Sequence, residues 1–71
     1  MSKHTKELKR RQAEIKKAET ELGSIRAELG EAYRLFNATA DPALLDACIY
    51  EINALHSRYD HALKGIKSLF L

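Results

Sequence analysis

A chain of 71 residues with 45% hydrophobic and 31% charged side chains is long enough for one small domain and too short for two. One proline and three glycines argue against general disorder, and the absence of tryptophan together with few β-branched residues argues against a sheet. The net charge of +2 is unevenly distributed, because residues 1–17 contain seven basic and two acidic side chains and carry +5.

The first predicted element is a helix over about residues 5–37. Apolar residues recur at every seventh position, and a second column follows three positions later, which is typical of a helix that packs along one stripe. The two columns are Leu8, Ile15, Leu22, Leu29 and Phe36, and Arg11, Ala18, Ile25 and Ala32. An acidic column flanks this stripe and contains Glu7, Glu14, Glu21 and Glu28.

Residues 38–41 are predicted to connect this helix to a second one over about residues 42–70. Asp41 is a favourable N-cap and Pro42 suits the first helical position, while Thr39 is the competing cap. Three neighbouring apolar columns follow along the second helix. The first column is Leu45, Ile52, Tyr59 and Ile66, the second is Ile49, His56, Leu63 and Phe70, and the third is Cys48, Leu55, Ala62 and Leu69.

The short connection predicts an all-α fold in which the two helices form an antiparallel, coiled-coil-like hairpin, a single domain over residues 1–71. We expect the first and second columns to pack against the first helix, with Leu22 opposite Tyr59 and Ile25 opposite His56. Leu8 then faces past the end of the second helix. The basic N-terminal end, residues 1–11, is therefore expected to fray or project.

In this arrangement the third column has no apolar partner within the hairpin. An exposed apolar column of this kind indicates an interaction surface, and we expect two hairpins to dimerise into a four-helix bundle. A helical protein partner is the alternative. The predicted self-association residues are Cys48, Leu55, Ala62 and Leu69, and the predicted polar rim is Tyr50, Glu51, Asn53, Arg58 and Tyr59.

The sequence carries no recognisable reaction chemistry. His56 and His61 are five positions apart and point to different sides of a helix, so they do not form the pair that helical zinc sites use. There is no glycine-rich phosphate loop and no nucleophile with a placed base. We therefore expect no metal, no cofactor and no enzymatic activity. His56 is expected to pack in its column, where burial would oppose its protonation.

The basic N-terminal segment offers an alternative function, because lysines and arginines on a helix can bind phosphates without reading bases. The candidate nucleic-acid contacts are Lys3, Lys6, Lys9, Arg10, Lys16 and Lys17. A solvated helix face and an anionic membrane surface are the other interpretations of this cluster. A single cysteine, no secretory signal and no apolar run long enough to cross a bilayer predict a cytoplasmic protein.

The C-terminal half resembles the YaaL-like proteins, a family of short uncharacterised proteins from Gram-positive, often spore-forming bacteria. The resemblance lies in Phe36-Asn37, Asp41-Pro42, Leu45-Asp46-Ala47, Ile49-Tyr50-Glu51, Asn53-Ala54, Arg58-Tyr59 and Leu63. It implies an intracellular bacterial protein and no particular activity.

Overall fold

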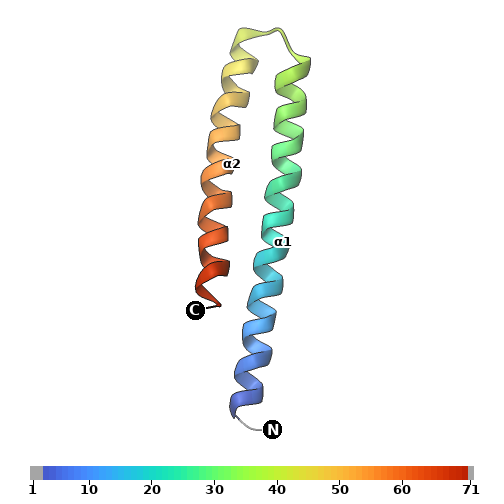
Figure 1. Cartoon of the computed structure of the whole chain (residues 1–71). Coiled ribbons are helices and arrows are strands. Elements are labelled where there is room, and N and C mark those ends of the chain that lie inside the picture. The colour runs from blue at the N-terminus through green and yellow to red at the C-terminus, as the bar shows by residue number, and fades with distance from the viewer. Residues whose placement is uncertain (1–2, 71) are drawn as a thin grey trace.

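The computed structural model describes residues 3–70. Helix α1 spans Lys3–Ala38 and helix α2 spans Pro42–Ser68, so a connection of three residues joins them. The helices lie side by side and antiparallel over the full length of α2, and residues 3–70 contain no β-strand (Figure 1). The predicted all-α fold with two packed helices is confirmed. Residues 1 and 2 of the predicted basic end, and residue 71 of the predicted domain, lie outside the described residues.

The connection is held by hydrogen bonds from its own side chains. Asp41 adopts an extended backbone conformation, and its Oδ1 accepts a hydrogen bond from the Ala43 backbone N–H at 3.0 Å. The Thr39 hydroxyl accepts from the Asp41 backbone N–H at 3.1 Å, which orders the residue before the helix. Pro42 occupies the first turn, where its missing N–H costs nothing. The predicted N-cap at Asp41 is therefore confirmed, and Thr39 supports the cap instead of competing with it.

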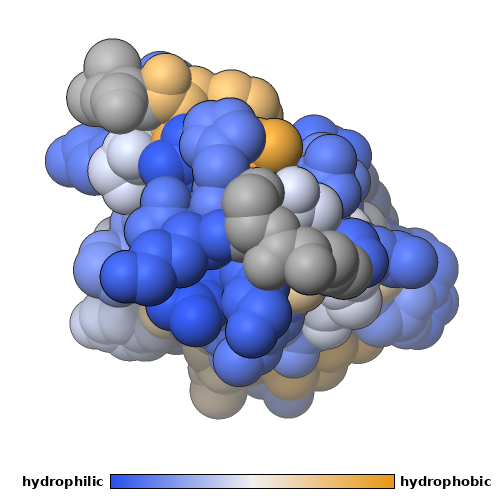
Figure 2. Space-filling view, turned by 90° about the horizontal axis from the view of Figure 1, so that it is seen from below, coloured by the Kyte–Doolittle hydropathy of each residue, from blue (hydrophilic) through white to orange (hydrophobic). Residues whose placement is uncertain are grey.

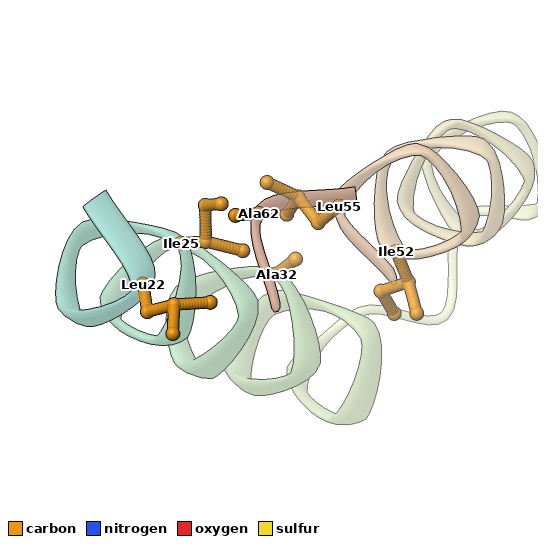
Figure 3. Close-up of a cluster of buried hydrophobic side chains, with 6 residues drawn as sticks. All are labelled: Leu22, Ile25, Ala32, Ile52, Leu55 and Ala62. Atoms are coloured by element: carbon orange, nitrogen blue, oxygen red, sulfur yellow. The ribbon is translucent and has the colours of Figure 1, made fainter. Parts of the chain in front are cut away.

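The interface between the helices is narrow and is built from small and aliphatic side chains. The buried residues are Leu22, Ile25 and Ala32 from α1, and Cys48, Ile52, Leu55 and Ala62 from α2. Figure 3 shows six of them directed into the space between the two helices. Among the described residues, only Ile25 and Leu55, which are 0% and 1% exposed, are almost completely enclosed. A core of this size is small even for a short chain, since hydrophobic stabilisation scales with the area removed from water.

The prediction that the third column lacks a partner within the hairpin is wrong. Cys48, Leu55 and Ala62 are buried, and it is the second column that lies mainly outside the interface, although its Leu63 is partly buried against the core. Ile49 and Phe70 in the second column are 44% and 70% exposed. The α2 helix is thus rotated about its axis relative to our expectation, so that the first and third columns face α1.

Two physical reasons favour this rotation. The small side chains of Cys48 and Ala62 let the two backbones approach closely, and large residues from the opposite helix can fill the space. The rotation also places His56 at the edge of the interface instead of opposite Ile25, so its ring nitrogen need not be buried without a partner. Small residues and a polar ring therefore select the same orientation.

The longer helix extends beyond the shorter one. The last turn of α2 meets α1 near Arg10 and Glu14, where these residues line a shallow hollow with Ser68 and Leu69. The first turns of α1 continue past this point (Figure 1). The basic end was expected to fray or project; the structure describes it as helical from Lys3 and projecting. Leu8 lies on this projecting part and is 45% exposed.

Candidate interaction surface

The two flanks of the hairpin have different chemistry. On one flank Arg58 of α2 pairs with Glu28 of the acidic column at 3.5 Å between Nη1 and Oε2, and nearer the connection this flank has a small hollow lined mainly by apolar side chains, among them the exposed Leu35. On the opposite flank the Tyr33 hydroxyl and Nε2 of His56 are 3.0 Å apart, and their rings meet edge to face. These two contacts identify which columns of α1 and α2 meet on each side.

We call the side marked by Tyr33 and His56 the open face. It consists of Tyr33 with the second column of α2, namely Ile49, His56, Leu63 and Phe70. Next to these residues, at the positions between the open face and the buried interface, the side chains are only partly buried. These are Leu29, Phe36, Leu45, Tyr59 and Ile66. The open face is therefore predominantly apolar along most of α2, with the exposed ring of His56 within it and one edge of α1 beside it.

Polar groups of α1 and α2 also contact each other at the border of the open face. Arg26 Nη2 donates a hydrogen bond to the Tyr59 hydroxyl at 3.1 Å, and the guanidinium lies 5.7 Å from the centre of the same ring. Each contact joins α1 to α2 and satisfies a polar atom that an approaching apolar partner would otherwise have to desolvate. An apolar partner that covered the open face would therefore not leave these polar atoms without a hydrogen-bond partner.

The predicted self-association residues do not lie on this face. Cys48, Leu55 and Ala62 belong to the interface within the hairpin, and Leu69 is half-buried beside the projecting part of α1. The polar-rim residues are dispersed. Tyr50 is 76% exposed, Glu51 and Asn53 are exposed, Arg58 lies on the flank of Glu28, and Tyr59 is partly buried beside the open face.

The basic candidates Lys3, Lys6, Lys9, Arg10, Lys16 and Lys17 are all exposed on α1. Figure 2 views the hairpin from the end that carries this segment, and the surface there is predominantly hydrophilic. Near the connection, Glu31 and Arg34 form an exposed ion pair on α1. The hydrogen bond from Arg34, with its positive charge, lowers the pKa of the Glu31 carboxyl, so this acidic group is charged at neutral pH.

Sequence reasoning missed Tyr33, Arg26 and the open face as a unit. The sequence does contain a signal for the open face, because Arg26 and Tyr33 occupy the column of α1 directly after its apolar stripe. In an antiparallel pair this column lies across from the second column of α2. His61 is exposed and separate from His56. Among residues 3–70 no three His, Cys, Asp or Glu side chains are grouped so as to hold a metal ion.

No family model, no curated protein and no solved structure matches this chain. The resemblance to the YaaL-like proteins therefore stays a prediction. Neither α1 nor α2, as far as residues 3–70 extend, has a stretch apolar and long enough for a membrane crossing.

Proposed function

We propose that this protein is a non-enzymatic interaction module of the cytoplasm that self-associates through its open face, two hairpins forming a four-helix bundle. The observation that carries the proposal is the uneven burial of the apolar columns. On the open face, Ile49, Tyr33 and Phe70 are 44%, 43% and 70% exposed, whereas the third column is closed within the chain. Contiguous apolar surface of this kind marks a site of association.

The free energy gained by burying apolar surface also favours self-association. A hairpin of two helices has one interface, and the stability of helices in proteins comes mainly from burying an apolar face. In a four-helix bundle each helix packs against two neighbours, so the partly buried column between them becomes the centre of the core. Apart from the buried Leu22 and Ile52, much of the first column of α2 and of the corresponding column of α1 has this intermediate burial, as Leu29, Phe36, Tyr59 and Ile66 illustrate.

The proposal is tested by measuring mass in solution for matched variants at neighbouring positions. Ile49→Asp places a charge on the open face, and Tyr50→Asp places the same charge one residue away on the outward side of α2. We expect light scattering to give the mass of two chains for the wild type and for Tyr50→Asp, and of one chain for Ile49→Asp. A wild type that stays monomeric at micromolar concentrations would contradict the proposal.

A second function is supported by a different observation, the projecting basic end of α1. An exposed helical segment with Lys3, Lys6, Lys9 and Arg10 on its outer columns matches the electrostatic requirement for binding phosphates along a nucleic acid. Fluorescence anisotropy with a short labelled duplex tests it. Binding should weaken steeply between low and physiological salt, and Lys9→Glu with Arg10→Glu should abolish it. Binding that is indifferent to salt or to these changes would eliminate this function.

A further inference from the structure

We propose that the two chains pair with their connections at opposite ends, so that each α1 runs antiparallel to the α1 of the other chain. This inference rests on the proposed self-association through the open face and adds the orientation and the register of the pair. The alternative places both connections at the same end, with each α1 beside the α2 of the other chain. Three observations separate the two arrangements.

The first observation is the separation of charge along the hairpin. Residues 3–17, at the projecting end, hold seven basic and two acidic side chains, for a net charge of +5. Residues 28–51, at the connection end, hold five acidic and one basic side chain, for a net charge of −4. Connections at the same end would bring like charges together at both ends of the bundle. Connections at opposite ends place each basic end beside the acidic end of the other chain.

The second observation is the length of α1 beyond α2. The apolar column from Leu8 to Phe36 is centred on Leu22, and α2 offers nothing opposite Leu8. An antiparallel pair of α1 helices centred on Leu22 sets Leu8 of one chain against Phe36 of the other, and Ile15 against Leu29. The projecting apolar residue is then covered. If both connections lie at the same end, Leu8 has no apolar residue of the other chain opposite it.

The third observation fixes the register. On the column of α1 that borders the open face, Glu19 and Arg26 are seven residues apart and opposite in charge. Centred on Leu22, the pair brings Glu19 of each chain level with Arg26 of the other. A shift of seven residues in one direction sets Glu19 against Glu19, and in the other direction Arg26 against Arg26. Like charges held opposite each other oppose association.

A two-fold axis at the level of Leu22 is also compatible with the pairing of the two α2 helices. Leu22 lies 16 residues before the end of α1, and Tyr59 lies 17 residues after the start of α2, so the two are at about the same level in the hairpin. The two-fold axis that relates the α1 helices near Leu22 therefore passes near Tyr59. It brings Ile49 of one chain level with Phe70 of the other, and His56 level with Leu63. The two exposed apolar side chains of the second column thus become partners.

The orientation is tested by the distance between two spin labels in the dimer. A single cysteine replaces Ala40, which is exposed in the connection, in a chain whose own cysteine is removed by Cys48→Ala. With connections at opposite ends, the labels are separated by the length of about 36 helical residues, or about 54 Å. With connections at the same end they lie within about 20 Å, since packed helices are about 8–10 Å apart.

Light scattering on the labelled protein distinguishes a wrong orientation from a lack of self-association. A mass of two chains with a label distance near 54 Å supports the inference, and the same mass with a short distance overturns the orientation while leaving self-association intact. A mass of one chain, for the labelled protein and for the wild type alike, overturns both proposals. Unlabelled wild-type protein is measured in parallel, so that a loss caused by Cys48→Ala is recognised as such.

A charge reversal tests the register without changing any cysteine. Glu19→Arg creates two like-charge contacts in each dimer, and we expect the dissociation constant to rise roughly tenfold at low salt. Adding Arg26→Glu restores opposite charges and should recover most of the affinity, and both effects should shrink in high salt. If the double variant is no tighter than Glu19→Arg alone, the register centred on Leu22 is wrong.

Discussion

Asp41 and Thr39 show how two short side chains begin a helix in a connection of three residues. The Asp41 carboxylate accepts a backbone N–H that the first turn of α2 cannot satisfy internally, and Thr39 accepts the N–H of Asp41 itself. The second bond supports the first, because it fixes the residue that carries the cap. The exposed N–H of Asp41 can use water instead, so the two bonds differ in importance.

This difference predicts the ranking of two substitutions. Asp41→Ala should lower the free energy of unfolding by about 1 kcal/mol, and Thr39→Ala should lower it by less. Asp41→Asn keeps an acceptor oxygen and serves as the control, with little expected change. Urea denaturation followed by circular dichroism measures all three. A larger loss for Thr39→Ala would mean that Thr39 is the principal cap.

Leu55 and Ile49 are similar in size and lie less than two turns apart on α2, but they face different surroundings. Leu55 is 1% exposed within the chain, whereas Ile49 is 44% exposed on the open face. Leu55→Ala should lower the free energy of unfolding by about 2–5 kcal/mol at every protein concentration, because it leaves a cavity between α1 and α2.

Ile49→Ala should behave differently, since in the proposed dimer this side chain packs against the second chain. The loss of stability should grow with protein concentration, because association stabilises the folded chain by mass action. Thermal melts over a hundredfold range of concentration distinguish the two variants. Equal, concentration-independent losses would show that Ile49 packs within its own chain.

At the scale of the element, α2 is an amphipathic helix with more apolar surface than one neighbour can cover. Its three columns cover a wide arc, and two adjacent helices in contact bury the part of that arc nearest the contact. The third column carries Cys48 and Ala62, which permit close approach, and the second carries His56, which finds Tyr33 at the edge. The second column therefore becomes the open face.

Gly65 gives a prediction for α2 that involves no packing change. A Cβ at this position would have nothing within 4 Å, and the residue is helical and exposed on the flank away from the open face. Gly65→Ala should therefore raise the free energy of unfolding by about 0.5–1 kcal/mol by reducing the conformational freedom of the unfolded chain. Ala54→Gly, also exposed and helical, is the control and should lower it by a similar amount. Both are measured by urea denaturation, and a destabilising Gly65→Ala would show that this site is occupied by a partner.

At the scale of the whole molecule, α1 extends beyond α2, and this projecting part carries both an apolar side chain and positive charge. It therefore links the proposed association to charge. Removing residues 1–9 leaves the buried interface of the hairpin unchanged, because the buried residues of α1 are Leu22, Ile25 and Ala32. It removes Leu8 and three lysines against one glutamate. We expect helicity per residue to be retained and the dissociation constant of the dimer to rise, most strongly at low salt.

Leu8→Ser separates the two contributions, since it removes the apolar contact and keeps every charge. Its effect on the dissociation constant should be nearly independent of salt. Analytical ultracentrifugation at two salt concentrations measures both variants. If the truncated chain dimerises as tightly as the wild type, the projecting part of α1 takes no part in the pair and the orientation inferred from it fails.

The sequence by itself determined the local structure. A strict seven-residue column from Leu8 to Phe36 requires a long helix, and Asp41 before Pro42 sets the start of the next one, because spacing and capping act between residues that are close along the chain. The antiparallel arrangement follows from a connection too short for anything else.

Only the tertiary structure decided which columns of α2 face α1. All three columns are predominantly apolar and adjacent, so helical periodicity is satisfied by either choice. The outcome depends on how closely Cys48 and Ala62 let α1 approach, and on whether Tyr33 stands where His56 can reach it. Those are properties of two helices in contact, and the spacing of residues along α2 contains neither of them.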